Sequence, residues 1–313
     1  MRIALALAAA LALAACDSNE QVGGIEAPAP HALAPTNLAA FFDCLREHSA
    51  TIVSAHRGGA GPGYAENAIP TFEHTLSLAP AFMEVDIART RDGQLVLMHD
   101  DTVDRTTDGH GAVSSLTAAQ FVALTLKDND GQALDGHPPT LRDALEWADG
   151  KTVLALDVKR GVSYEDTARA VEAAHAMGRV MFVTYSVDGA ARMHRVAPDA
   201  MLFVTIHSAG DLATLERRGV DLTHVVAWTG TDEPNSGLNA ALARRGVEVE
   251  FGTLGGRDSW DARFDRAHGD QYAQFAEAGL QVIATGRPAE AVRDLDAHDG
   301  ASGYSALQCV RAH

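Results

Sequence analysis

The sequence has few positive charges for its length. Among its 313 residues, 25 Lys and Arg stand against 42 Asp and Glu, which gives a formal net charge of −17. A protein that binds nucleic acid needs clustered cations to neutralise the phosphate backbone. The charge balance therefore argues against a nucleic-acid partner. It remains compatible with a small anionic substrate held by a local Arg, Lys or metal ion.

Long hydrophobic runs are also missing, with one exception at the N-terminus. After Arg2, an unbroken apolar run rich in Ala and Leu extends from Ile3 to Ala15. This run has the length of the apolar part of a signal peptide and is too short to span a bilayer. Residues 1–15 are therefore predicted to be a targeting segment that is not part of the fold.

The end of this segment, Leu-Ala-Ala-Cys at residues 13–16, resembles the lipobox of bacterial lipoproteins. In that motif, cleavage before the cysteine leaves its thiol to carry a diacylglyceryl group. The resemblance implies that Cys16 is lipidated and that the protein is anchored to a membrane on the periplasmic side of the cell envelope. An ordinary secretory signal peptide that ends near a cysteine is the alternative.

Residues 16–37 are rich in Pro, Gly, Asn and Ala and have no apolar period, so they are predicted to be a flexible tether. Residues 38–313 suit one large domain or two small ones, and 46% hydrophobic residues supply a sizeable core. No internal repeat is present. No serine has the flanking glycines of a nucleophile elbow, so a serine hydrolase is not supported.

Strand and helix patterns alternate along this region. Between most candidate strands lie helical patterns, such as residues 68–79 and 164–178. About eight such units predict a (β/α)8 TIM barrel. The surplus strand is expected within residues 200–230, and residues 100–139 are expected to form an excursion after the third strand. The nine candidate strands are residues 51–56, 82–88, 94–99, 152–158, 179–185, 200–206, 224–228, 247–251 and 280–285.

If Cys16 is lipidated, the remaining cysteines are Cys44 and Cys309, one near each end of the domain. A barrel brings its first and last units side by side, so in an oxidising compartment these two could form a disulfide. Two separately buried thiols are the alternative.

Carboxylates stand on otherwise apolar strands. Glu84 and Asp86 are two residues apart and share a strand face, and so do Asp157 and Lys159. Buried charges are costly unless they are paired or bind a cation. At the mouth of a barrel, the three carboxylates would offer oxygen ligands to one divalent cation, Mg²⁺ or Ca²⁺. Rim residues or internal salt bridges are the alternative.

Two histidines stand at the ends of candidate strands. His56 ends residues 51–56, and His99 ends residues 94–99. On one face of a barrel, two imidazoles could lie on opposite sides of a bound phosphodiester as general acid and general base.

These residues carry a resemblance to the glycerophosphodiester phosphodiesterase family. The matching strings are AHRGG at 55–59, Glu66-Asn67 followed by AIPTFEHTL, and MEVDIARTRDGQLVLMHDDTVDRTTDGHGAVSSLT from residue 83. The match is specific from residue 51 to about 160. Beyond that segment it is only barrel-like.

The resemblance implies a role for each matching residue. Attack by the substrate's own hydroxyl would give a cyclic phosphate that water then opens. The implied residues are His56 and His99 as the acid and base, Glu84, Asp86 and Asp157 as metal ligands, Arg57 and Lys159 on the phosphate, and Glu66 and Asn67 ordering the loop over it.

Two departures from the family pattern concern the substrate. Asp157 stands in Asp-Val-Lys, where the family has Glu-x-Lys. The Asp-x-Lys form is similar to that of the sphingomyelinase D phospholipases, which favours a lipid substrate. The late segment reads FGTLGG at 251–256, where the family often has Trp-Thr-Val-Asn. The sequence therefore does not identify the alcohol that leaves.

Three functions follow. The first is a metal-dependent phosphodiesterase that releases an alcohol and glycerol 3-phosphate from glycerophosphodiesters. The second is a phospholipase D-like enzyme that acts on lysophospholipids or sphingolipids. The third is an envelope binding module without turnover, which has little need for both His56 and His99. The sequence leaves the oligomeric state open.

Overall fold

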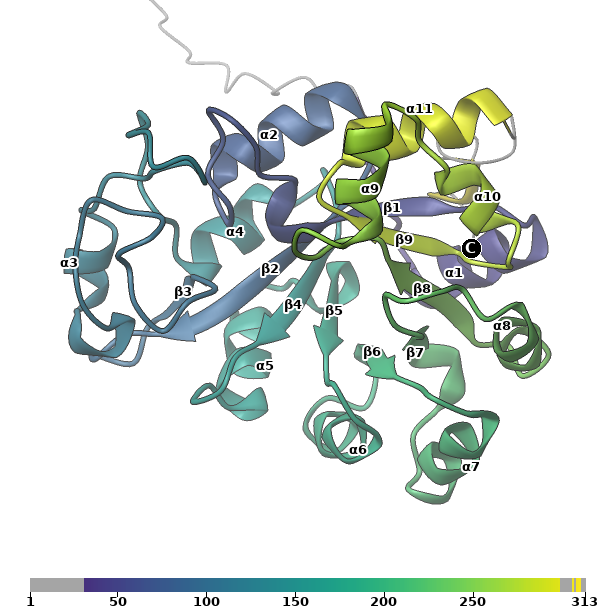
Figure 1. The fold of residues 1–313 in the computed structure, drawn as a ribbon. Coiled ribbons are helices and arrows are strands. Elements are labelled where there is room, and N and C mark those ends of the chain that lie inside the picture. The colour runs from purple at the N-terminus through teal and green to yellow at the C-terminus, as the bar shows by residue number, and fades with distance from the viewer. Residues whose placement is uncertain (1–30, 299–305, 307, 311–313) are drawn as a thin grey trace, which may run out of the picture.

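The computed structural model describes residues 31–298, 306 and 308–310 (Figure 1). The predicted targeting segment, Cys16 and most of the predicted tether lie outside these residues. In the described part of the chain, no helix has both the length and the apolar character needed to cross a membrane.

Eight parallel strands close into a barrel, which confirms the predicted TIM barrel (Figure 1). Closure follows because β1 pairs with β9 on one side and with β2 on the other. The barrel strands are β1 (Ile52–Ala55), β2 (Phe82–Arg89), β4 (Leu154–Val158), β5 (Val180–Val183), β6 (Met201–Thr205), β7 (Val225–Trp228), β8 (Glu248–Gly252) and β9 (Val282–Thr285).

The ninth strand, β3 (Leu95–Leu97), is antiparallel to β2, with Leu97 opposite Ile87. The expectation that the surplus strand falls within residues 200–230 was therefore wrong, since β6 and β7 are both barrel strands. Only residues 90–94 separate β2 from β3. So short a connection permits a hairpin but not the crossover that a parallel neighbour requires.

The excursion predicted after the third strand follows β3, which is third in chain order and forms this hairpin with β2. It contains η2 (Val113–Ser115) and α3 (Ala118–Phe121). A separate small core stabilises it, in which Val103, Val113 and Phe121 pack with Met98.

Helices surround the strands on the outside of the barrel (Figure 1). Polar N-caps start several of them, as where Ser163 and Ser259 accept hydrogen bonds from backbone N–H groups of the first turn. The helices are α2 (Ile69–Leu78), α4 (Leu141–Trp147), α5 (Tyr164–Ala173), α6 (Val187–Val196), α7 (Ala209–Arg217), α8 (Ser236–Ala243), α9 (Trp260–Ala267), α10 (Tyr272–Ala276) and α11 (Pro288–His298), with 3₁₀ turns η1 (His56–Gly58), η3 (Met177–Arg179) and η4 (Leu222–His224).

The N-terminal end of the barrel is covered by α1 (Leu38–Glu47). The rings of Phe41 and Phe42 pack against Phe82 at the start of β2, with centroids 5.7 and 6.1 Å away. Leu33 joins the same core, is 1% exposed, and donates its N–H to the carbonyl of Lys151 at 2.8 Å. The folded part therefore begins earlier than the boundary predicted after residue 37.

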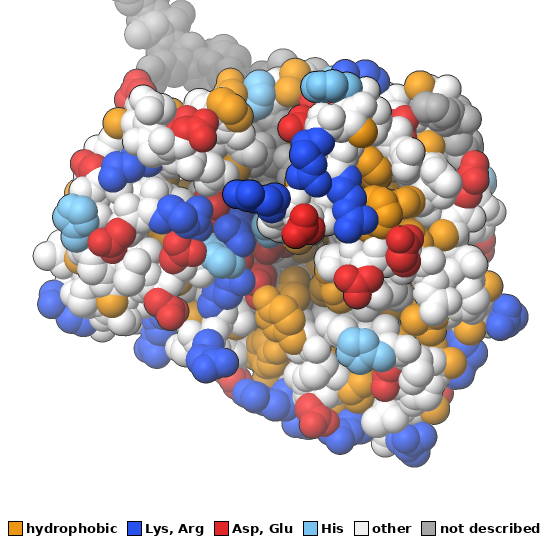
Figure 2. Space-filling model, viewed as in Figure 1, with side chains coloured by type: hydrophobic (Ala, Val, Ile, Leu, Met, Phe, Trp, Pro, Cys, Tyr) orange, Lys and Arg blue, Asp and Glu red, His pale blue; other side chains and the backbone are white. Residues whose placement is uncertain are grey.

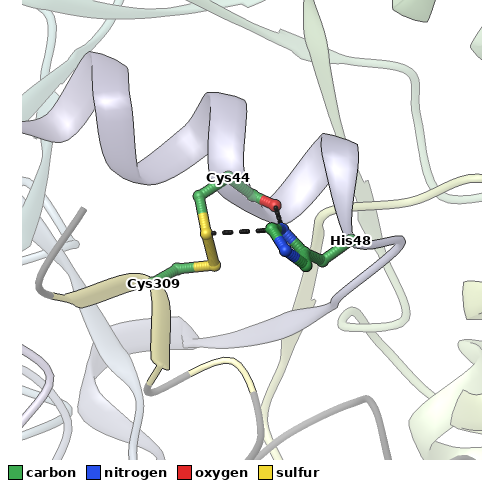
Figure 3. A group of neighbouring side chains, drawn as sticks. All are labelled: Cys44, His48 and Cys309. Carbon is green, nitrogen blue, oxygen red and sulfur yellow. Dashed lines mark hydrogen bonds between the residues drawn. A yellow bond between two sulfur atoms is a disulfide. The ribbon is translucent and has the colours of Figure 1, made fainter. Parts of the chain in front are cut away.

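A disulfide joins Cys44 of α1 to Cys309, 265 residues later in the chain. Figure 3 shows it beside His48, whose Nδ1 lies 2.9 Å from the carbonyl oxygen of Cys44. Of the two alternatives for these cysteines, the structure has the linked pair. The bond lies at the end of the barrel opposite the strand ends where the predicted site residues gather.

Candidate active site

A cavity of about 280 Å³ opens at the carboxyl ends of the barrel strands. Figure 2 shows Lys and Arg side chains gathered beside a hollow in this face, with hydrophobic side chains along another edge of it. Seven of the predicted site residues line the cavity: His56, Arg57, Glu84, Asp86, His99, Asp157 and Lys159.

The turn after β1 positions His56 and Arg57 at the cavity. Arg57 has a left-handed backbone, with φ of 51°, and its N–H donates to Glu84 Oε2 at 2.9 Å. Gly58 follows with φ of 83°, and a Cβ there would lie 2.2 Å from the Phe72 ring on α2. Such strain is costly for a residue with a side chain and is found most often at functional sites. The AHRGG string thus folds into a turn that only glycine can complete.

Asn67 does not line the cavity but holds a residue that does. Its Nδ2 donates to Asp86 Oδ2 at 2.7 Å, and its Oδ1 accepts the N–H of Asp86 at 2.9 Å. Asn67 also has a left-handed backbone, with φ of 56°. Asn67 therefore orders the Asp86 carboxylate on β2.

Glu66 lies beside a neighbouring hollow and bridges two arginines. Arg57 Nη1 and Arg105 Nη2 approach its carboxylate at 3.0 and 2.7 Å. Burial acts to raise the pKa of Glu66, but the two guanidinium groups outweigh it, so the pKa falls below its ordinary value. Glu66 is thus ionised and holds Arg57 toward the cavity.

Glu84, Asp86 and Asp157 form an acidic cluster, with one oxygen from each within 4.8 Å of the others. Burial, together with the carboxylates of Asp86 and Asp157, raises the pKa of Glu84 well above its ordinary value. Among the described residues, nothing forms a hydrogen bond with the buried Asp157 Oδ1. Crowded, buried carboxylate oxygens with a free lone pair fit a hard divalent cation.

Two basic side chains border the acidic cluster. Lys159 Nζ lies 2.8 Å from Asp86 Oδ1 and 2.5 Å from Asp157 Oδ2. Burial acts to lower the pKa of Lys159, but these carboxylates raise it above its ordinary value, so the ammonium stays charged. Arg57 Nε, buried and without a hydrogen-bond partner among the described residues, lies 3.4 Å from Asp86 Oδ2. Both cations can reach an anion at the cavity rim.

His56 and His99 differ in their surroundings. Burial, followed by the nearby Arg57 guanidinium, lowers the pKa of His56 to about 4, so its imidazole is neutral near pH 7. His99 reaches the cavity from the returning arm of the β2–β3 hairpin and not from a barrel strand. Its Nδ1 lies 2.7 Å from Asp100 Oδ1, a contact that orients the ring.

Three polar residues of this site were missed in the sequence. Asp100 holds His99, and Arg105 Nε binds Asp100 Oδ2 at 2.7 Å. The hydrogen bond from Arg105 lowers the pKa of Asp100 to about 2. Tyr185 donates its hydroxyl to Asp157 Oδ2 at 2.5 Å. Tyr185 ends the predicted strand 179–185, and polar residues at barrel strand ends are a signal that could have found it.

The inner part of the cavity holds another missed residue, Glu250 on β8, which is 4% exposed. Burial raises the pKa of Glu250 to about 8, although a hydrogen bond with the Ser54 side chain acts against that rise. Trp228 of β7 pairs in register with Glu250 and lies 5.4 Å from the Phe203 ring. A Cβ at Gly252 would lie 2.3 Å from the indole, so glycine makes room for Trp228.

Residues 56–209 match the model of the glycerophosphoryl diester phosphodiesterase family. A glycerophosphodiester phosphodiesterase of Caldanaerobacter subterraneus is 36% identical over 114 residues, which cover 36% of this chain and 46% of that protein. A putative glycerophosphodiester phosphodiesterase of Bacillus subtilis is 37% identical over 109 residues, covering 34% and 44%. The chain thus spans about half the length of these curated relatives.

Solved structures extend the likeness over the barrel. A glycerophosphoryl diester phosphodiesterase from Parabacteroides distasonis has a TM-score of 0.73 and 30% identity, covering 85% of this chain and 94% of that one. A phosphodiesterase from Oleispira antarctica, solved with the product sn-glycerol-3-phosphate, has a TM-score of 0.60 and 18% identity, covering 80% and 99%. The second likeness shows the fold alone.

Proposed function

The chain belongs to the glycerophosphoryl diester phosphodiesterase family, and from this premise we propose that it hydrolyses glycerophosphodiesters to an alcohol and glycerol 3-phosphate. The observation that carries the proposal is one cavity that combines an acidic cluster, two bordering cations and two histidines.

Glu84, Asp86 and Asp157 would hold one divalent cation, Mg²⁺ or Ca²⁺, because their oxygens lie close together and Asp157 Oδ1 is without a partner among the described residues. When bound, such a cation would neutralise charge that develops on the phosphoryl oxygens. Arg57 and Lys159 would bind the same phosphate from the cavity rim.

The two histidines would move the protons. His56, neutral beside Arg57, would accept the proton of the attacking substrate hydroxyl as the bond to phosphorus forms. His99, held by Asp100, would give its proton to the departing alcohol oxygen as that bond breaks. Water would then open the cyclic phosphate with the two roles reversed.

The test is hydrolysis of a panel of glycerophosphodiesters and their lysophospholipid counterparts, with Mg²⁺, Ca²⁺ or EDTA, comparing wild type with His56→Ala and His99→Ala. Release of glycerol 3-phosphate that needs the cation and both histidines is expected. Turnover of the acylated substrates alone would assign the protein to phospholipase D-like chemistry. If no substrate of the panel is hydrolysed, the proposed enzymatic function is contradicted.

We also propose an export route and an anchor, which rest on residues 1–16. Cleavage before Cys16 would leave a lipidated thiol on the periplasmic side of the envelope. Metabolic labelling with a radioactive fatty acid should mark the wild type and not Cys16→Ser, and the variant should move to the soluble fraction. Equal labelling of the two would contradict lipidation at this residue.

A further inference from the structure

The cavity continues into the barrel past Asp157. Ala155 lies two residues before Asp157 on β4, so it shares the inward face and lies one level deeper in the barrel. Ala155 on β4 and Ala284 on β9 are small residues of the cavity lining. We call this inner part the well, defined by Ala155, Val183, Phe203, Trp228, Glu250 and Ala284.

The well contains one ionisable side chain, Glu250. It forms no part of the acidic cluster, and among the described residues Ser54 is the side chain that shares a hydrogen bond with it. A buried carboxylate with so little compensation is costly unless a cation reaches it. The remaining oxygen capacity of Glu250 is therefore available to a ligand in the cavity.

Aromatic rings stand beside this carboxylate. Trp228 is the register partner of Glu250 on β7, and its ring packs at 5.4 Å from Phe203. Gly252 gives the indole its place, because a Cβ there would overlap the ring. Aromatic faces next to a carboxylate are the arrangement that recognises quaternary ammonium groups.

We propose that the well binds a quaternary ammonium group, so that the preferred substrates are glycerophosphodiesters whose alcohol carries a trimethylammonium head. This inference rests on the proposed function. Val183, Ala155 and Ala284 offer apolar contact to methyl groups. A primary ammonium or a polyol needs several directional hydrogen-bond partners. The cavity lining offers Glu250, the indole N–H of Trp228 and Thr205 in or beside the well, and Glu250 already shares a hydrogen bond with Ser54. A trimethylammonium head needs only charge and apolar contact.

The test compares sn-glycero-3-phosphocholine with sn-glycero-3-phosphoglycerol in steady-state kinetics of the full-length protein. In Glu250→Gln, kcat/KM for the choline diester should fall about 10-fold while that for the glycerol diester changes less than about 2-fold. The matched control is Glu248→Gln, because Glu248 lies two residues earlier on β8, is equally buried, and binds Arg46 outside the cavity. Glu248→Gln should leave the ratio of kcat/KM for the two diesters unchanged. An equal loss on both substrates in Glu250→Gln would overturn the proposal.

A binding measurement separates this inference from the proposed function. Titration calorimetry with tetramethylammonium chloride should show binding to the wild type that weakens in Glu250→Gln and in Trp228→Leu. If Glu250→Gln no longer unfolds cooperatively on heating, Trp228→Leu alone tests the ammonium site. Binding without any hydrolysis would refute the proposed function and keep the ammonium site. Hydrolysis without tetramethylammonium binding, or binding unaffected by both variants, would overturn the ammonium site alone.

Discussion

Asn67 and Asp86 are joined by two hydrogen bonds, one to the side-chain carboxylate and one from the backbone N–H of Asp86. The pair ties the loop after β1 to the inward face of β2. An amide can do this because it carries a donor and an acceptor on one planar group. The relationship explains how a residue that does not line the cavity helps to shape the acidic cluster.

We expect Asn67→Ala to weaken divalent cation binding about 10- to 100-fold, because supporting hydrogen bonds of metal ligands carry effects of this size. Activity measured against Mg²⁺ or Ca²⁺ concentration would show the shift, with partial recovery at high concentration. Asn235→Ala, at the N-cap of α8, is the control and should leave the metal dependence unchanged. An unchanged curve for Asn67→Ala would show that the pair has no part in cation binding.

Removing the partner of His99 should slow the chemical step. In Asp100→Asn the 2.7 Å contact with His99 Nδ1 loses its charge, and kcat is expected to fall about 10²-fold. KM should change little, because Asp100 acts through His99 and not on the substrate. Asp104→Asn, an exposed residue of the same excursion that contacts His110, is the matched control. Equal kcat values in both variants would argue against a positioning role.

Glu250 should make folding stability depend on pH. Its folded pKa of about 8 lies above the ordinary value of 4.5, so the folded state holds the proton more tightly than the unfolded state. The contribution of Glu250 to the free energy of unfolding is fully present below about pH 4.5 and is lost as the pH rises to about 8. The slope between these limits is at most about 1.4 kcal/mol per pH unit.

Chemical denaturation at pH 5, 6, 7 and 8 would measure this effect as the difference between wild type and Glu250→Gln. The free energy of unfolding of the wild type should fall more steeply with rising pH than that of the variant. Parallel curves would mean that Glu250 titrates at its ordinary pKa in the folded protein. Subtracting the variant removes the contributions of Glu248 and His56, whose pKa values are also shifted.

The disulfide should stabilise the barrel without taking part in catalysis. Cys44→Ser with Cys309→Ser is expected to lower the free energy of unfolding by about 2–5 kcal/mol, the usual range for a native disulfide. Activity at low temperature should persist, because the bond lies at the end of the barrel opposite the cavity. A loss of activity in the still-folded double variant would contradict this separation.

Local patterns in the sequence were sufficient to predict most elements and the residues that meet at the cavity. All nine candidate strands are present, because β-branched runs between turn residues mark strands without reference to distant partners. The shared face of Glu84 and Asp86 follows from the two-residue period of a strand. The antiparallel pairing of β3 with β2 can also be predicted from the sequence, since the short connection at residues 90–94 permits only a hairpin.

The sequence by itself determined that this is a TIM barrel with an acidic cluster and two histidines near the ends of its strands, because strand period and strand–helix alternation are local properties. Only the tertiary structure decided which distant side chains join them. Arg105 reaches Glu66 across 39 residues, and Tyr185 reaches Asp157 across 28. Trp228 lies beside Glu250 through the register of β7 and β8. Such contacts depend on register, barrel closure and side-chain packing, which no local periodicity encodes.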